Sequence, residues 1–258
     1  MNDHQPKATM NWKYLFPVAI VVVLIVGAYW LKIRTKPPAT NITKRETSAT
    51  ESTLALLQRG MREHNAGAYD AAMDLYHKVL QREPGNASAH YNLGQIFNAR
   101  EEYAKAQWEY EAALKTDPKS LEARINLGVV LYRQRKFAPA AEEFRKVLQA
   151  SPQNSTAIFN LGITLVELEQ NDEAIQLLNA ALRQEPNNAQ TYYYLGLALQ
   201  KQKKLAESKA ALQKAIELNP RFADAYMALS KVYTAQGEQR LAQEAMAKAG
   251  ELNPRLKK

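Results

Sequence analysis

Hydrophobic residues recur along most of the chain at helical spacing, in paired runs of about 13 residues. In residues 121–154 the apolar positions of the two runs are Ile125, Leu127, Val130 and Leu131, then Phe137, Ala140, Ala141, Phe144 and Val147. One pair of amphipathic helices cannot bury both of its faces, so neighbouring pairs must stack. The pattern therefore predicts an all-α solenoid of stacked helical pairs.

Prolines mark the period of this pattern, because one falls every 34 residues: Pro84, Pro118, Pro152, Pro186, Pro220 and Pro254. Aligned on them, the chain divides into six units, which cover residues 53–86, 87–120, 121–154, 155–188, 189–222 and 223–256. We number the places of each unit from its first residue. Small residues such as Gly128 at the eighth place and Ala140 at the twentieth predict a close approach of two helices.

The pattern resembles the tetratricopeptide repeat, most clearly in the second unit, which contains HYNLGQIF and then EEYAKAQWEYEAALKTDP. The resemblance covers about four fifths of the chain. It implies a right-handed superhelix of six helix-turn-helix units over residues 51–258. It implies a fold and no particular chemistry, because the repeat does not set the function.

Residues 15–31 form an unbroken apolar segment, LFPVAIVVVLIVGAYWL. As a helix it would span about 25 Å, which is enough for a thin hydrocarbon core. We predict one transmembrane anchor there, after an N-terminal tail over residues 1–14 and before a flexible linker over residues 32–50. A cleaved signal peptide is the alternative, because residues 26–28 are small and lie at the offsets of a cleavage site.

Two features of the chain point to opposite sides of the membrane for the repeats. Two basic residues precede the segment and five follow it within 15 residues, which favours a cytoplasmic C-terminal side: Lys7 and Lys13, then Lys32, Arg34, Lys36, Lys44 and Arg45. The resemblance to anchored bacterial repeat proteins implies the opposite side, because their repeats often lie outside the cytoplasm. That resemblance also implies a bacterial inner membrane, and a role in envelope complex assembly, secretion or maturation.

Charge and composition exclude several classes of function. The net charge of +8 comes from 34 basic and 26 acidic residues, and residues 1–52 supply half of it with 7 basic against 3 acidic. The third, fourth and fifth units have 6, 1 and 6 basic residues against 3, 5 and 2 acidic ones, so no continuous basic track for nucleic acid is present. The chain has no cysteine, which excludes disulfides, thiolate metal sites and a lipid-bearing cysteine.

The resemblance implies that the first helices of the units line a concave groove. By the same resemblance, the fifth, ninth and twelfth places of each unit face this groove. In units three to five they hold mostly apolar residues, which suits an apolar or amphipathic segment of a protein or peptide partner. The predicted partner-binding residues are Tyr91, Asn92, Ile125, Asn126, Val129, Tyr132, Phe159, Asn160, Ile163, Val166, Tyr193 and Leu197. The alternative is that some of these side chains pack on neighbouring first helices.

Asn92, Asn126 and Asn160 occupy the same place in three successive units. Peptide-binding superhelices of the resembled family use such a ladder of amides, which donate to and accept from the backbone of an extended peptide. The ladder stops at Tyr194 in the fifth unit. It therefore predicts contacts to a peptide over three units only.

The sequence carries no zinc-binding H-E-x-x-H, nucleophile elbow, phosphate loop or dinucleotide fingerprint. His64, His77 and His90 spread over a unit and a half, and His90 takes a place where large core residues stand in other units. We therefore expect a membrane-tethered scaffold with no catalytic residue, metal or cofactor. One alternative is a subunit that binds through its convex face, or through a bare C-terminal end that also offers a route to homo-oligomers. The other is a nucleic-acid-binding repeat protein, which the alternation of charge along the units disfavours.

Overall fold

The computed structural model describes residues 51–256, and the predicted tail, anchor and linker lie outside this part. The first helices of six pairs are α2 (Thr53–Asn65), α4 (Ala87–Ala99), α6 (Leu121–Arg133), α8 (Ser155–Glu167), α10 (Ala189–Lys201) and α12 (Ala223–Ala235). The second helices are α3 (Tyr69–Arg82), α5 (Tyr103–Thr116), α7 (Phe137–Ala150), α9 (Asn171–Gln184), α11 (Leu205–Leu218) and α13 (Gln239–Leu252). A 3-10 turn, η2 (Pro254–Leu256), follows. No helix within residues 51–256 is long and apolar enough to cross a membrane.

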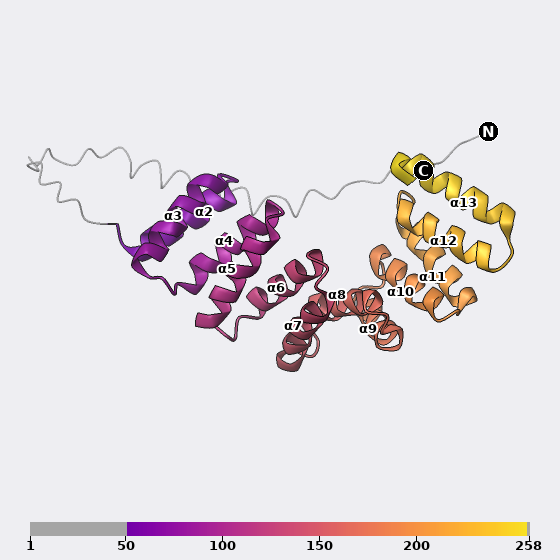
Figure 1. Cartoon of the computed structure of the whole chain (residues 1–258), viewed down its shortest axis with the longest axis horizontal. Coiled ribbons are helices and arrows are strands. Elements are labelled where there is room, and N and C mark those ends of the chain that lie inside the picture. Colours follow the sequence, from indigo (N-terminus) through magenta and orange to yellow (C-terminus); the bar gives the residue numbers. More distant parts are fainter. Residues whose placement is uncertain (1–50, 257–258) are drawn as a thin grey trace, which may run out of the picture. The chain divides into compact units, whose positions relative to one another are not determined.

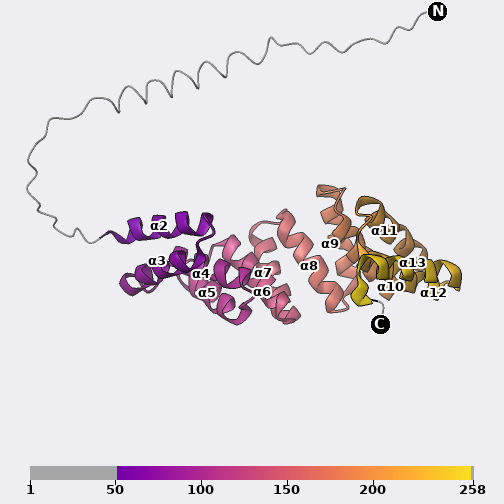
Figure 2. The same cartoon turned by 90° about the horizontal axis from the view of Figure 1, so that it is seen from above.

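The pairs stack in chain order, and each second helix from α3 to α11 packs between its own first helix and that of the next pair (Figures 1 and 2). One apolar core runs through the first five pairs, and a second cluster joins α11, α12 and α13. The predicted all-α solenoid of six repeats is confirmed. The handedness of its superhelix stays a prediction.

The first helices begin at the first place of each unit because the preceding residue caps them. The side chain of that residue accepts a hydrogen bond from the backbone N–H three residues later in five pairs, at Ser52, Asn86, Ser120, Asn154 and Asn188. Such caps satisfy an otherwise unpaired helical N–H group. Phe222 stands at this place before α12 and makes no side-chain cap.

The turn inside each pair contains one residue with a positive φ, always at the fifteenth place: Gly67, Glu101, Arg135, Glu169, Lys203 and Gly237. Glycine adopts this left-handed conformation freely, whereas the other four residues adopt it at a conformational cost. The same turn therefore connects the helices in all six pairs.

A glycine at the eighth place allows the two helices of a pair to approach closely. A Cβ atom on Gly94 or Gly128 would lie 2.6 Å from the ring of Tyr110 or Phe144, respectively. The sixth pair has Ser230 at this place, and the residue equivalent to the two rings is Met246, which is 39% exposed. The predicted role of the small residues in close helix packing is therefore confirmed.

Replacing Tyr110 with phenylalanine is expected to raise the free energy of unfolding by about 1 kcal/mol. The hydroxyl group of Tyr110 is buried and has no hydrogen-bond partner within residues 51–256. Phe144 fills the equivalent place of the next pair without a hydroxyl. Urea denaturation of the two proteins would measure the change, and a loss of stability would show that the hydroxyl is bonded in solution.

Pairs of polar side chains, buried in the second helical pair and half-buried in the third, replace apolar contacts of the first. His90 Nδ1 lies 2.7 Å from Glu109 Oε2, its Nε2 lies 2.9 Å from the carbonyl oxygen of Pro84, and both side chains of the pair are 7% exposed. Arg124 makes the equivalent contacts, to Glu143 at 2.7 Å and to the next repeat proline at 2.8 Å. A carbonyl oxygen only accepts hydrogen bonds, so Nε2 of His90 carries a proton. The contact between Nδ1 of His90 and the carboxyl group of Glu109 requires a second proton, either on Nδ1 or on the carboxyl group.

Stability is expected to fall as the pH rises above 4.5 because of Glu109. Burial raises the pKa of Glu109 above its ordinary value of 4.5, against the opposing effect of His90. The folded chain therefore keeps a proton on Glu109 that the unfolded chain releases. The stability that this proton contributes is complete below pH 4.5 and is lost as the pH rises through the pKa of Glu109 in the folded state. Urea midpoints between pH 4.5 and pH 8 would measure it. Glu109→Gln is the control, and an equally steep profile for this variant would contradict the assignment.

Candidate functional site

The twelve predicted partner-binding residues all lie on the first helices α4, α6, α8 and α10. Ten of them are half-buried, so part of each side chain is open to a partner. Ile163 and Val166 differ, because they are only 6% and 2% exposed and belong to the apolar core. These two residues therefore support the fold and offer almost no surface for binding.

The remaining apolar members of the set pack against the core while keeping an exposed part: Tyr91, Ile125, Val129, Tyr132, Phe159, Tyr193 and Leu197. The ring of Tyr91 lies 6.0 Å from that of Tyr110, and the ring of Tyr193 lies 4.9 Å from that of Phe222. Packing against other parts of the chain therefore accounts for part of this apolar pattern. The partner-binding role of these residues stays a prediction.

The three asparagines of the predicted ladder use an N–H group within the chain. Asn92 and Asn160 donate to the backbone oxygens of Ser88 and Thr156, four residues earlier on their own helices, at 2.7 and 2.8 Å. Asn126 donates instead to the hydroxyl oxygen of Tyr91 at 3.2 Å. Each amide also carries a second N–H and an oxygen. The amides are therefore fixed in two different orientations.

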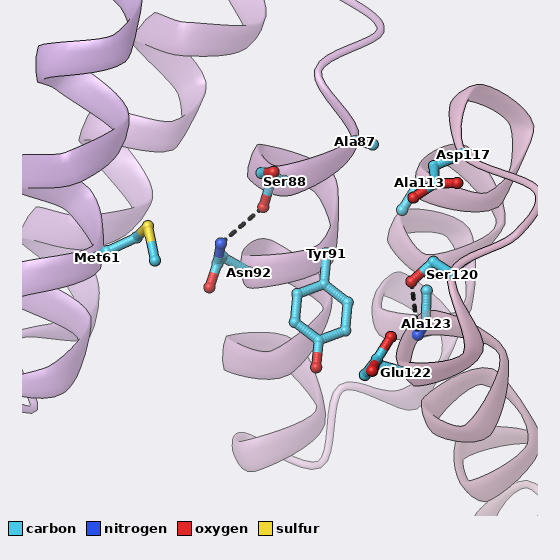
Figure 3. A pocket seen from close by; sticks show the side chains of 10 residues that line it. All are labelled: Met61, Ala87, Ser88, Tyr91, Asn92, Ala113, Asp117, Ser120, Glu122 and Ala123. Atoms are coloured by element: carbon cyan, nitrogen blue, oxygen red, sulfur yellow. Dashed lines mark hydrogen bonds between the residues drawn. The ribbon is translucent and has the colours of Figure 1, made fainter.

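A cleft of about 300 Å³, here called the first cleft, is lined by residues of the first helices α2, α4 and α6 and by the end of α5 (Figure 3). Its lining residues are Met61, Ala87, Ser88, Tyr91, Asn92, Ala113, Asp117, Ser120, Glu122 and Ala123. Two of the predicted residues, Tyr91 and Asn92, belong to it. The charged residues that line it, Asp117 and Glu122, are both acidic.

Hydrogen bonds hold the ring of Tyr91 in place in the first cleft. Its hydroxyl oxygen accepts from Gln95 Nε2 at 3.1 Å and from Asn126 Nδ2 at 3.2 Å. Burial raises the pKa of Tyr91, and the negative charge of Glu122 adds to this rise while the Asn126 hydrogen bond opposes it. The ring of Tyr91 thus lines the first cleft in a fixed position, near the carboxylate of Glu122.

A second cleft of about 210 Å³ occupies the equivalent place two repeats further along. It is lined by Ser155, Thr156, Phe159, Ala181, Glu185, Asn188 and Thr191. Counted by place, Phe159 corresponds to Tyr91, Glu185 to Asp117, and the capping residue Asn188 to Ser120. The solenoid therefore repeats one arrangement, an aromatic ring with a carboxylate and a helix cap, on the same side.

The side chains of residues 51–256 form no cluster of three or more histidine, aspartate or glutamate residues that could hold a metal ion. His90 and Glu109 form a buried pair inside the second repeat, and neither residue lines either cleft. The arrangement on the side of the first helices therefore offers binding contacts: rings, amides and carboxylates.

Models of the tetratricopeptide repeat match nearly all of the described chain, over residues 64–107 and 131–197, 99–155, 189–222 and 223–256. The chain belongs to the tetratricopeptide-repeat family. No curated protein matches its sequence.

Solved structures of other tetratricopeptide-repeat proteins share the fold of this chain. MamA from Desulfovibrio magneticus RS-1 is 25% identical with a TM-score of 0.60, and the match covers 65% of this chain and 95% of MamA. PilF of Pseudomonas aeruginosa is 20% identical with a TM-score of 0.63, covering 78% of this chain and 92% of the other. YrrB, described as a repeat protein with an unusual peptide-binding site, is 24% identical with a TM-score of 0.56, covering 69% and 92%.

The prediction of site residues in this tetratricopeptide-repeat chain missed the acidic residues of the clefts, which are Asp117, Glu122 and Glu185. Asp117 and Glu185 stand at the place directly before the repeat proline, outside the first helices on which the prediction was based. Their recurrence at one place of the repeat, two units apart, is the signal that could have identified them.

Proposed function

We propose that this chain is a scaffold that binds a segment of a partner protein across its first helices, from α4 to α10. The pair of equivalent clefts supports this proposal, because a repeated arrangement on one side of a solenoid suits a partner that extends along it. The exposed parts of Ile125 and Val129 lie on the intervening helix α6. YrrB, whose likeness is one of fold, is also described by a peptide-binding site.

We expect Phe159→Asp to lose most of the partner protein that can be crosslinked to the full chain and recovered with it, because the change removes the aromatic ring that lines the second cleft. Ala206→Asp is the matched control, since Ala206 is exposed on the second helix α11. Thermal unfolding would verify that both variants fold. Equal recovery with Phe159→Asp and wild type would contradict binding at this side. Ile163 is unsuitable for this test because it is buried.

The second-helix side is the alternative binding surface. Trp108 on α5 is 60% exposed, and Met246 on the last helix α13 is 39% exposed. Exposed large apolar side chains are candidates for contacts in a larger complex or with a second copy of the chain. In that case Trp108→Ser or Met246→Ser would remove the crosslinked partner and Phe159→Asp would not.

We also propose that residues 15–31 tether the scaffold to a bacterial inner membrane, where it serves envelope complex assembly, secretion or maturation. The unbroken apolar run and the basic residues after it support this proposal. The full chain should stay in the membrane fraction after a carbonate wash, and its release would contradict the tether. Protease accessibility of the repeats in sealed vesicles would then assign them to one side.

A further inference from the structure

The two clefts share one electrostatic property, which is that every charged residue lining them is acidic. They contain Asp117 and Glu122 in the first cleft and Glu185 in the second. Within the part of the chain that the structure describes, none of these three carboxylates forms an ion pair, although Lys and Arg outnumber Asp and Glu by 27 to 23 in residues 53–258. The clefts are therefore negative sites on a chain that is positive as a whole.

Local hydrogen bonds orient two of these carboxylates. Asp117 Oδ1 accepts from the backbone N–H of Lys119 at 3.2 Å, and Glu185 Oε2 accepts from Asn188 Nδ2 at 3.2 Å. Each carboxylate has further lone pairs for a second donor. The two carboxylates thus lie as hydrogen-bond acceptors at defined positions in the clefts.

An aromatic ring lines each cleft beside the carboxylate, Tyr91 in the first and Phe159 in the second. A cation above an aromatic ring is attracted by the electron density of the ring, and a carboxylate beside it adds direct charge attraction. A guanidinium or ammonium group therefore satisfies both elements of each cleft, whereas an anion would be repelled by both.

Neighbouring repeats lack this combination. The third repeat has Ser151 where Asp117 and Glu185 stand, and Ile125 where the rings stand. The fifth repeat has Asn219 in place of the acid, and Phe222 packs against Tyr193 with 4.9 Å between ring centroids. Among repeats two to five, the cation-binding arrangement thus occurs in the second and the fourth.

We propose that the two clefts bind two basic side chains, lysine or arginine, of one extended segment of a partner protein. This inference rests on the proposed function and specifies the chemistry of the partner. Consecutive first helices contact one another, so their axes lie about 10 Å apart and the two clefts about 20 Å. An extended chain covers that distance with about six residues. The partner segment therefore carries basic residues about six positions apart.

Fluorescence anisotropy with the full chain would test the proposal. The probe is a labelled nine-residue peptide of serine, threonine and alanine with arginines at its second and eighth positions. We expect it to bind, and we expect neutralising either cleft, by Asp117→Asn with Glu122→Gln or by Glu185→Gln, to weaken binding about fivefold. The uncharged citrulline peptide should bind more weakly still, because it loses the charge at both sites.

Glu142→Gln with Glu207→Gln is the matched control, because both residues are exposed on second helices and line neither cleft. This variant should bind the arginine peptide as the wild type does. Equal affinity for the citrulline peptide, a loss only in the control variant, or no binding of the probe would overturn the inference. Tighter cleft-dependent binding of a peptide of residues 32–50 would also overturn it, by assigning the clefts to the chain's own linker. The Phe159→Asp crosslinking result judges the proposed function separately.

Discussion

Replacing His90 with leucine is expected to lower the free energy of unfolding by about 3–5 kcal/mol. The change removes the group that faces Glu109, whose side chain is only 7% exposed. A buried carboxylate without its partner must either stay charged in a medium of low polarity or take up a proton, and both cost free energy. The same change removes the contact with the carbonyl oxygen of Pro84.

The double variant His90→Leu with Glu109→Leu is expected to recover most of this loss. The first repeat already has Leu56 and Leu75 at the two equivalent places, and both are buried. Replacing a buried ion pair by apolar residues of similar size is often neutral or stabilising. Urea midpoints of the wild type, both single variants and the double variant complete the thermodynamic cycle. A double variant as unstable as His90→Leu alone would show that the pair itself, rather than the unpaired carboxylate, determines the loss.

Replacing Gly128 with alanine is expected to lower the free energy of unfolding by about 1–3 kcal/mol. The added Cβ atom would lie 2.6 Å from the fully buried ring of Phe144, which cannot move away without displacing the helix. Gly162→Ala is the graded control, because the nearest atom there is a side-chain methyl of Leu178 at 3.0 Å. We expect a smaller loss for this variant in the same urea series.

The variant Gly128→Ala with Phe144→Leu tests the cause of that loss. Leucine stands in the place of Phe144 in the fourth repeat, opposite Gly162. If the clash with the ring causes the instability, the second change reduces the cost of the first. Additive losses from the two changes would instead point to the helix backbone around Gly128.

The periodic features of this fold could be predicted from the sequence. The prolines and small residues of each 34-residue unit indicate where its helices end and where they approach closely. The first helix of each pair begins at the first residue of its unit, for example at Thr53 and Ala87. These features depend on local backbone chemistry and on contacts inside one unit. They recur because each unit faces similar neighbours.

The side chains of the candidate site were harder to predict, because their exposure depends on which residues the adjacent helices present. Ile163 and Val166 stand at places that are half-buried in the second, third and fifth repeats, yet both join the core in the fourth. The single substitution of a capping residue by Phe222 puts a ring against Tyr193. Such differences in burial arise from contacts between particular units, which a pattern common to all units does not predict.

The C-terminal pair has a consequence for how the stack comes apart. Its second helix buries only Ala242, Ala245, Ala249 and Gly250, and its first helix follows Phe222, which makes no side-chain cap. In a linear array each unit is held by its neighbours alone, so one pair at the edge of the stack can open while the others stay folded. The residues that line the two acidic clefts all lie between Met61 and Thr191, outside this pair. Opening of the sixth pair therefore leaves both clefts intact.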